Sequence, residues 1–95
     1  MRLLGKPLLQ NFVANYTDAR SHIESWEAEV EEAEWSTPHD LKRRYPKASI
    51  VRNLNVVFNI CGNKYRLWVK VSYKNRMVLV KKIGTHKEYD KWDIT

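Results

Sequence analysis

The apolar residues in the first third of the chain recur at the 3.6-residue period of an α-helix. Lys6-Pro7 precedes the first stripe, where a proline suits an opening helical turn, and the stripe consists of Leu9, Phe12, Val13 and Tyr16. A second stripe lies within residues 18–35 and consists of Ala19, Ile23, Trp26, Val30 and Ala33. Ser21 and Glu24 have capping-box spacing near the beginning of this second helix.

A short third helix is expected directly afterwards. Thr37 is its predicted N-cap, Pro38 its first residue and Asp40 an acid in its first turn, and Pro46 follows its end. The run Lys42-Arg43-Arg44 lies in the last turn, where cations suit the helix dipole. The same run could also bind phosphate.

After Pro46 the apolar residues alternate with polar ones, which is the period of a β-strand. This alternation predicts three strands, over residues 56–60, 65–73 and 77–83. Gly62-Asn63 and Lys74-Asn75 have turn composition, so the three strands form an antiparallel meander. Arg2, Leu3 and Leu4 are a candidate fourth strand at its edge.

Thr85-His86-Lys87-Glu88 is another capping-box pattern and predicts a final short helix containing Tyr89 and Trp92. We therefore expect an α+β fold, in which an antiparallel sheet of three or four strands has helices packed on one face. The 95 residues give enough material for one hydrophobic core, so residues 1–95 are interpreted as a single domain.

The charge of the chain is concentrated in the strand-rich half. The whole sequence has 17 basic and 11 acidic residues, a net charge of +6. Residues 1–48 have 7 basic and 8 acidic side chains, whereas residues 49–95 have 10 basic and 3 acidic ones. The second half therefore has a net charge of +7 and is the half expected to meet a polyanion.

Alternation also predicts which side chains share a face of the sheet. The central strand should turn one row toward the helices, namely Tyr65, Leu67, Val69, Val71 and Tyr73. The opposite row is cationic and should meet water or a ligand, and it consists of Lys64, Arg66, Trp68, Lys70 and Ser72. Cations with an aromatic ring among them suit single-stranded nucleic acid, although a solvated outer face is the simpler alternative. Lys81 and Lys82 lie on opposite faces of the third strand, and the pattern does not decide which of them joins Arg66.

Several kinds of chemistry are not supported by the sequence. His22, His39 and His86 lie far apart in the chain, and Cys61 is the only cysteine, so no metal site and no disulfide are expected. Cys61 has no predicted base beside it, and no glycine-rich loop is present to bind phosphate. No apolar segment is long enough for a membrane span, and a single cysteine favours a cytoplasmic protein without a cofactor.

Phosphodiester chemistry without a metal remains compatible with these residues. Cleaving RNA through its own 2′-hydroxyl requires a base, an acid for the 5′-oxygen and cations around the phosphorane. His86 is the natural titrating group, because histidine changes its charge near neutral pH. The simpler interpretation is that His86 is a surface residue of a capped helix.

Two segments resemble the HigB family of type II toxins. They are VVFNICGNKYRL at residues 56–67 and GTHKEYD at residues 84–90, and the resemblance extends over most of the chain. It implies a RelE/ParE-like fold in which helices back an antiparallel sheet. It also implies an endoribonuclease (mRNA interferase) that cleaves mRNA, usually on the translating ribosome, and is neutralised by a HigA antitoxin with a helix-turn-helix domain.

The resemblance also indicates site residues. It places Asn59, Asn63, Arg66, His86, Tyr89 and Asp90 in the two motifs. We interpret His86 as the acid or base, Tyr89 as its hydrogen-bonding partner or second proton donor, and Arg66 with Lys81 as the phosphorane-stabilising cations. Asp90 is interpreted as structural, and Leu79 stands where some relatives have an aromatic residue.

The remaining candidates would contact the RNA outside the reacting atoms. Asn59 is a candidate RNA contact, and Asn63 and Trp68 could touch bases or could only serve the turn and the packing. The cations expected to guide the polyanion are Lys64, Lys70, Lys82, Lys87 and Lys91.

Two other functions share this architecture. One is a non-catalytic RNA- or ribosome-binding module, and the other is a ParE-like toxin that acts on gyrase. The expected partners are mRNA, the ribosome and the antitoxin. The chain would contact promoter DNA only indirectly, through the antitoxin. The antitoxin could cover the cationic face or bind the acidic second helix.

Overall fold

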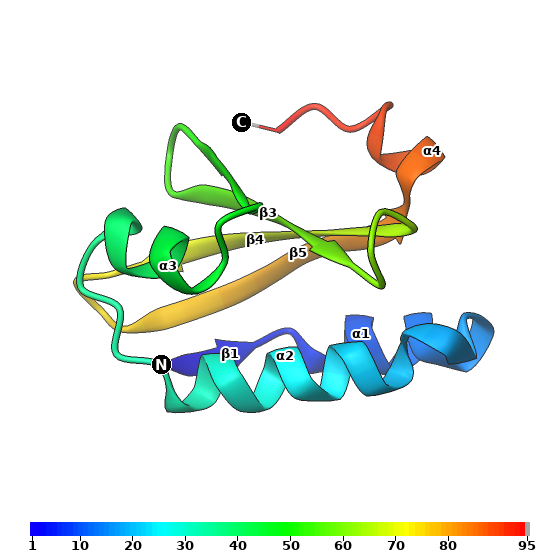
Figure 1. Cartoon of the computed structure of the whole chain (residues 1–95), viewed down its shortest axis with the longest axis horizontal. Helices are drawn as coiled ribbons and strands as arrows, with labels where there is room; N and C mark the ends of the chain where they lie inside the picture. The colour runs from blue at the N-terminus through cyan, green and yellow to red at the C-terminus, as the bar shows by residue number, and fades with distance from the viewer. Residues whose placement is uncertain (95) are drawn as a thin grey trace.

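One five-stranded sheet runs through the computed structural model, which describes residues 1–94 (Figure 1). The strand order is β1-β5-β4-β3-β2, with β1 parallel to β5 and the other neighbours antiparallel. The strands are β1 (Arg2–Leu4), β2 (Ser49–Val51), β3 (Asn55–Ile60), β4 (Tyr65–Ser72) and β5 (Met77–Thr85). The expected α+β class, the meander and the edge strand β1 are confirmed.

The fifth strand, β2, is the element that alternation does not predict. It has three residues, and both Ser49 and Ile50 are exposed. A strand this short, without one buried face, leaves no period-two signal. It pairs with β3 at the edge of the sheet opposite β1.

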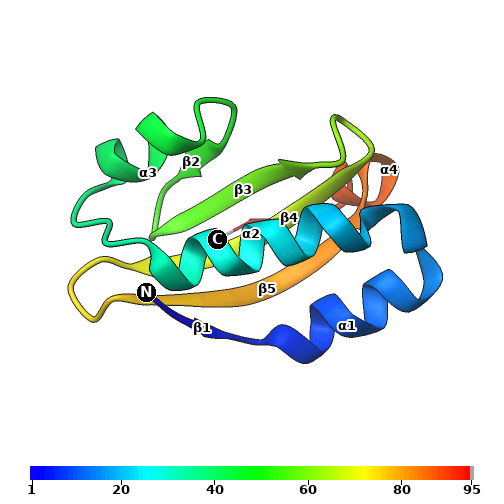
Figure 2. The same ribbon diagram turned by 60° about the horizontal axis from the view of Figure 1, so that its bottom comes forward.

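Two long helices cover one face of the sheet, as expected. Figure 2 shows α1 (Lys6–Asn15) and α2 (Arg20–Glu32) on the same face, joined by the 3₁₀ turn η1 (Thr17–Ala19). The third helix, α3 (Pro38–Arg44), follows α2 at one end of the sheet. The last helix, α4 (His86–Tyr89), lies on the other side of the sheet from α1 and α2 (Figure 1). No helix among residues 1–94 is long and apolar enough to cross a membrane.

Two of the three predicted side-chain caps are confirmed. Thr37 caps α3 in a capping box with Asp40, and Thr85 caps α4 in a capping box with Glu88. The prediction for Ser21 is wrong, because η1 leads directly into α2 and places Ser21 inside the first helical turn. Side-chain caps therefore form where an extended residue precedes the helix, and not where another helical turn does.

The core lies between the sheet and the two long helices. The predicted helix stripes and the predicted inner row of β4 supply most of it: Leu9, Phe12, Val13, Ile23, Trp26, Val30, Tyr65, Leu67, Val69 and Val71 are all buried. Fully burying one such side chain contributes about 1.5–3 kcal/mol to folding. This shared core fixes the position of β4 and β5, the strands that carry the predicted site.

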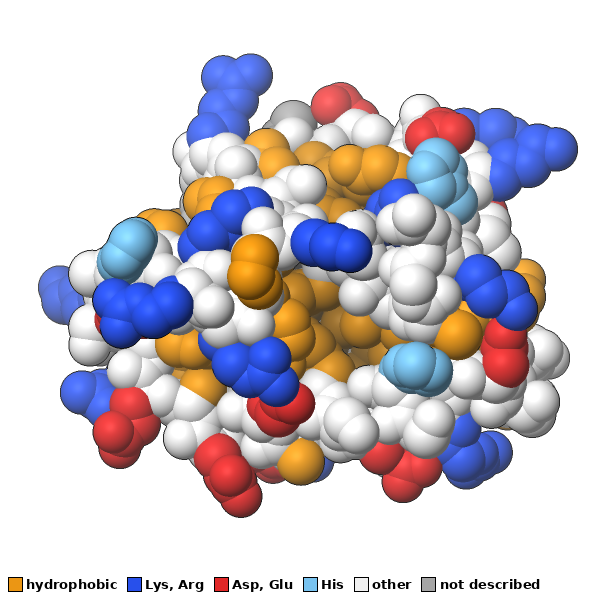
Figure 3. Space-filling model, in the orientation of Figure 1, with side chains coloured by type: hydrophobic (Ala, Val, Ile, Leu, Met, Phe, Trp, Pro, Cys, Tyr) orange, Lys and Arg blue, Asp and Glu red, His pale blue; other side chains and the backbone are white. Residues whose placement is uncertain are grey.

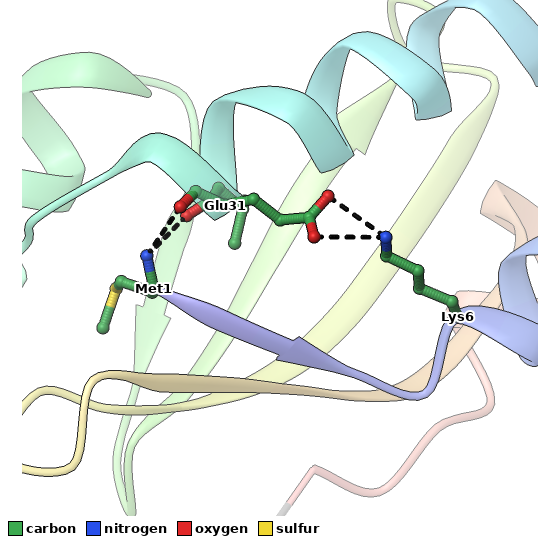
Figure 4. A network of polar contacts seen from close by, with 4 residues as sticks. Met1, Lys6 and Glu31 are labelled. Carbon is green, nitrogen blue, oxygen red and sulfur yellow. Dashed lines mark hydrogen bonds and ion pairs between the residues drawn. The ribbon is translucent and has the colours of Figure 1, made fainter.

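The N-terminal residue fastens β1 to the end of α2 (Figure 4). The Met1 amine donates hydrogen bonds to the carbonyl oxygens of Val30, Glu31 and Ala33 at 3.0, 3.1 and 2.7 Å. Lys6 also forms an ion pair with the Glu31 carboxylate at 3.1 Å. These contacts lie outside the predicted site, so they supply a comparison for contacts within it.

Candidate functional site

The junction of β5 with α4 brings three predicted site residues together. His86 opens α4 and Tyr89 lies one turn later, with 6.3 Å between their ring centroids in an edge-to-face arrangement. The guanidinium carbon of Arg66, on the neighbouring strand β4, lies 5.6 Å from the centroid of the Tyr89 ring. Tyr89 thus lies near both the guanidinium and the imidazole, and these three side chains are called the row below.

The turn between β3 and β4 holds both ends of this row. Arg66 donates through Nη1 to the carbonyl oxygens of Asn63 at 3.1 Å and Tyr65 at 3.2 Å. The backbone N–H of His86 donates to the carbonyl oxygen of Lys64 at 3.1 Å. Three consecutive carbonyl groups thus fix the guanidinium and the start of α4 relative to each other.

The side chains of His86 and Arg66 differ in exposure. The His86 side chain is 53% exposed, and its Nδ1 lies 3.7 Å from Oδ2 of Asp90. Arg66 is only 9% exposed and forms no ion pair with a carboxylate of residues 1–94. The imidazole can reach a ligand from water, and the guanidinium lies beside Tyr89 with no carboxylate of residues 1–94 to neutralise it. Figure 3 shows basic side chains and a histidine at the surface over α4.

The expectation that the whole outer row of β4 meets water or a ligand is wrong for Trp68. Its ring is 8% exposed and its Nε1 donates to Oδ1 of the fully buried Asn55 at 2.8 Å. Trp92, just after α4, packs over it with 6.2 Å between ring centroids. Trp68 therefore packs beneath Trp92 and has no exposed ring face on which a base could stack.

Comparison with known proteins identifies the family. The model of the HigB toxin family, described as the RelE-like toxic component of a toxin-antitoxin system, matches residues 19–92. This chain belongs to the HigB toxin family.

Curated relatives of this HigB-family chain agree with the match. It is 26% identical over 93 residues to the mRNA interferase HigB of Escherichia coli O6:H1, covering 96% of this chain and 90% of the relative. It is 24% identical over 92 residues to the mRNA interferase toxin HigB of Escherichia coli K12, covering 95% of this chain and 88% of the relative. The protein of Shigella flexneri, also named mRNA interferase HigB, matches at the same 24%. The expected family is thus confirmed, and with it the role of toxin in a system that contains an antitoxin.

In this HigB-family chain a β-bulge in β5 places Lys81 and Lys82 together. Lys82 lies opposite Trp68 in the ladder, and its Nζ lies 6.0 Å from the centroid of the Trp92 ring. The next pair along the ladder is Val69 with Val80, so Lys81 is the extra residue of the bulge and both lysines oppose Trp68 in the outer row. Both lysines also line a groove beside α1. The expectation that they lie on opposite faces of the strand is therefore wrong, because the bulge interrupts the alternation.

The structure also places Lys64 away from the outer face. Its ammonium forms an ion pair with Asp18 in η1, and the Tyr65 hydroxyl donates to the same carboxylate at 2.7 Å. The bonds from Lys64 and then Tyr65 lower the pKa of Asp18, and the Asp18 contact raises the pKa of Lys64. Lys64 is thus engaged in holding the β3–β4 turn, which leaves it poorly placed to guide RNA.

The other predicted RNA contacts surround the row. Asn59 is the cross-strand partner of Arg66, and Asn63 is exposed in the β3–β4 turn. Lys70 lies half-buried further along β4, and Lys87 and Lys91 are exposed on and just after α4.

Trp92 is the site residue that sequence reasoning does not single out. It contacts Trp68, Tyr89 and Lys82, with 5.7 Å between its centroid and that of Tyr89. Gly84 permits this arrangement, because a Cβ there would lie only 3.0 Å from Cζ2 of Trp92. The spacing of His86, Tyr89 and Trp92 at every third residue is the available signal, since such residues neighbour one another on a helix.

Proposed function

We propose that this chain is an endoribonuclease that cleaves mRNA on the translating ribosome without a metal ion and thereby stops translation. The observation that carries the proposal is the row of Arg66, Tyr89 and His86, with an exposed imidazole at one end and an unneutralised guanidinium at the other. The names of the curated relatives, mRNA interferases, support it.

The proposed mechanism assigns one role to each of these groups. Neutral His86 takes the proton of the RNA 2′-hydroxyl, whose oxygen attacks the phosphorus. The bond from phosphorus to the 5′-oxygen breaks, and the Tyr89 hydroxyl gives its proton to that leaving oxygen. The products are a 2′,3′-cyclic phosphate and a free 5′-hydroxyl, and water restores the protonation of both side chains.

Positive charge would stabilise the crowded phosphorane. Arg66 is already held by two carbonyl groups, so little reorganisation is required when charge develops beside it. Lys81 and Lys82 would supply further positive charge from the bulge in β5. Lys70, Lys87 and Lys91 would attract the RNA strand over a longer range and in a salt-dependent way.

The proposal includes the partners and the place of action. The toxin would meet mRNA and the ribosome in the cytoplasm and be neutralised by a HigA-like antitoxin with a helix-turn-helix domain. Promoter DNA would be contacted through that antitoxin.

The test is to induce this chain alone in cells and map the 5′ ends of transcripts. We expect new internal 5′-hydroxyl ends with the wild type and none with His86→Ala or Arg66→Ala. Lys70→Ala, which removes one long-range cation, should retain most of the cleavage. Melting curves of the purified variants establish that each one folds.

Two outcomes would contradict the proposal. A plain RNA-binding module would leave transcripts intact and bind somewhat more weakly after every loss of a cation, Lys70→Ala included. A ParE-like toxin would inhibit gyrase supercoiling while the transcripts stay whole.

A further inference from the structure

A cleft opens beside the candidate site, at an edge of β3 that β2 leaves free. β2 pairs with β3 only at Asn55, Val56 and Val57, so residues 58–60 have no neighbouring strand on that side. The cleft there has a volume of about 390 Å³, and its lining includes Arg44, Tyr45, Lys47, Phe58, Asn59 and Asn63.

The lining combines an apolar floor with polar groups that have no other partner. Phe58 is buried and Tyr45 half-buried, and their rings meet at 5.0 Å. The side chains of Asn59, Asn63 and Lys47 form no hydrogen bond or ion pair with any residue that the structure describes. A flat ring with hydrogen-bonding edges and an attached phosphate would satisfy both kinds of surface.

This cleft and the adjacent cleft differ in the charge of the side chains that line them. Arg44 and Lys47 line it and no carboxylate does, although Arg44 also pairs with Glu29 outside it. The adjacent cleft shares Tyr45 and Asn59 but is lined by Glu29 and by no lysine or arginine. A polyanion would therefore enter the first cleft and be repelled from the second.

We propose that this cleft is a nucleotide subsite, which holds one unpaired nucleotide of the RNA beside the scissile phosphate. The inference rests on the proposed function, because the nucleotide in the cleft belongs to the RNA strand that the site would cleave. Asn63 lines the cleft and its carbonyl group binds Arg66 at 3.1 Å, while Asn59 is the cross-strand partner of Arg66. Neighbouring strands lie about 5 Å apart, so the cleft and the guanidinium are one strand from each other. The base lies on the floor with its edge toward the two amides, and the phosphate lies at Lys47.

The test measures binding without cleavage. A fluorescent single-stranded RNA, methylated at every 2′-oxygen so that it cannot be cut, is titrated against the wild type, Lys47→Ala, Asn63→Ala and Lys74→Ala. Lys74 is exposed in the turn between β4 and β5 and is the matched control. We expect Lys47→Ala and Asn63→Ala each to weaken binding about fivefold. Lys47→Ala should also reduce the slope of log affinity against log salt by about 0.7, whereas Lys74→Ala should behave as the wild type.

The outcomes separate this inference from the proposed function. Equal affinity of the wild type and both cleft variants, or no binding by the wild type, overturns the subsite. Unchanged RNA binding with weakened antitoxin binding also overturns it and makes the cleft a protein-docking surface. Weakened RNA binding by the cleft variants, together with intact transcripts in cells, supports the subsite and contradicts the ribonuclease. Two separate variants keep the test decisive if one of them fails to fold.

Discussion

The backbone N–H of His86 donates a hydrogen bond to the carbonyl oxygen of Lys64, with 3.1 Å between the two atoms. The start of α4 is thus fastened to the β3–β4 turn. The side chain of the same Lys64 reaches the opposite way and pairs with Asp18 in η1, a residue 46 positions earlier in the sequence. The position of the imidazole consequently depends on a contact with the helical layer.

We predict that Asp18→Asn lowers activity more than stability. The substitution removes the charge that holds Lys64 and weakens the bond from Tyr65, so the turn carrying Arg66 and His86 becomes less fixed. RNA cleavage should fall several-fold, because small displacements in a site reduce rates strongly. The free energy of unfolding should change little, since exposed ion pairs contribute little to stability.

Glu31→Gln is the matched control for this prediction, because it breaks the exposed ion pair with Lys6 away from the site (Figure 4). Cleavage assays and urea unfolding of both variants provide the comparison. Equal cleavage rates for Asp18→Asn and Glu31→Gln would show that the β3–β4 turn does not need the Asp18 contacts for activity.

Acid should abolish the contribution of Asp18 to stability. Hydrogen bonds from Lys64 and Tyr65 lower the pKa of Asp18 below its ordinary 3.8, so its carboxylate stabilises the fold above that value. The contribution is lost as the pH falls through the lowered pKa of the folded state. Urea midpoints of the wild type and Asp18→Asn should therefore differ only slightly at neutral pH and converge well below pH 3.8. A difference that persists in strong acid would contradict this assignment.

The cap of α4 should matter for activity. The Thr85 hydroxyl accepts a hydrogen bond from the Glu88 backbone N–H at 3.2 Å, and Glu88 returns one to the Thr85 N–H at 2.8 Å. Thr85→Ala should destabilise α4 by about 1 kcal/mol. A four-residue helix near the end of the chain can open alone, so cleavage should fall while the global melting temperature barely moves. Thr85→Ser should retain cleavage, and equal activity of Thr85→Ala and Thr85→Ser would contradict the role of the cap.

Trp92 should report on the packing behind the site. Its ring covers Trp68, so Trp92→Ala should expose Trp68 to water and shift its fluorescence to longer wavelength. Trp92→Phe should preserve most of this cover. Trp92→Phe lacks the same fluorophore, so it is the reference for Trp92→Ala. An emission maximum that does not differ between these two variants would show that Trp68 is shielded by other residues.

Local patterns predict much of this fold. Alternation along β4 correctly assigns its inner row, and the caps at Thr37 and Thr85 are visible as residue types at fixed spacing. Such features depend on neighbours within a few positions, which a sequence displays directly.

The errors arise where distant segments meet. Trp68 is buried because Trp92 folds back over it, and Lys64 is engaged because Asp18 lies across the layer. Lys81 and Lys82 lie together opposite Trp68 because of a β-bulge, which one extra residue creates without a change in composition. None of these relationships has a local signature.

The central claim is that the row of Arg66, Tyr89 and His86 cleaves RNA. Its most direct test is the single-turnover cleavage rate of a labelled mRNA on purified ribosomes, compared between wild type and a folded His86→Ala variant. Loss of a proton-transfer group should slow the reaction by a factor of about 100 to 10,000 and leave mRNA binding in place. Cleavage by His86→Ala at the wild-type rate would contradict the account.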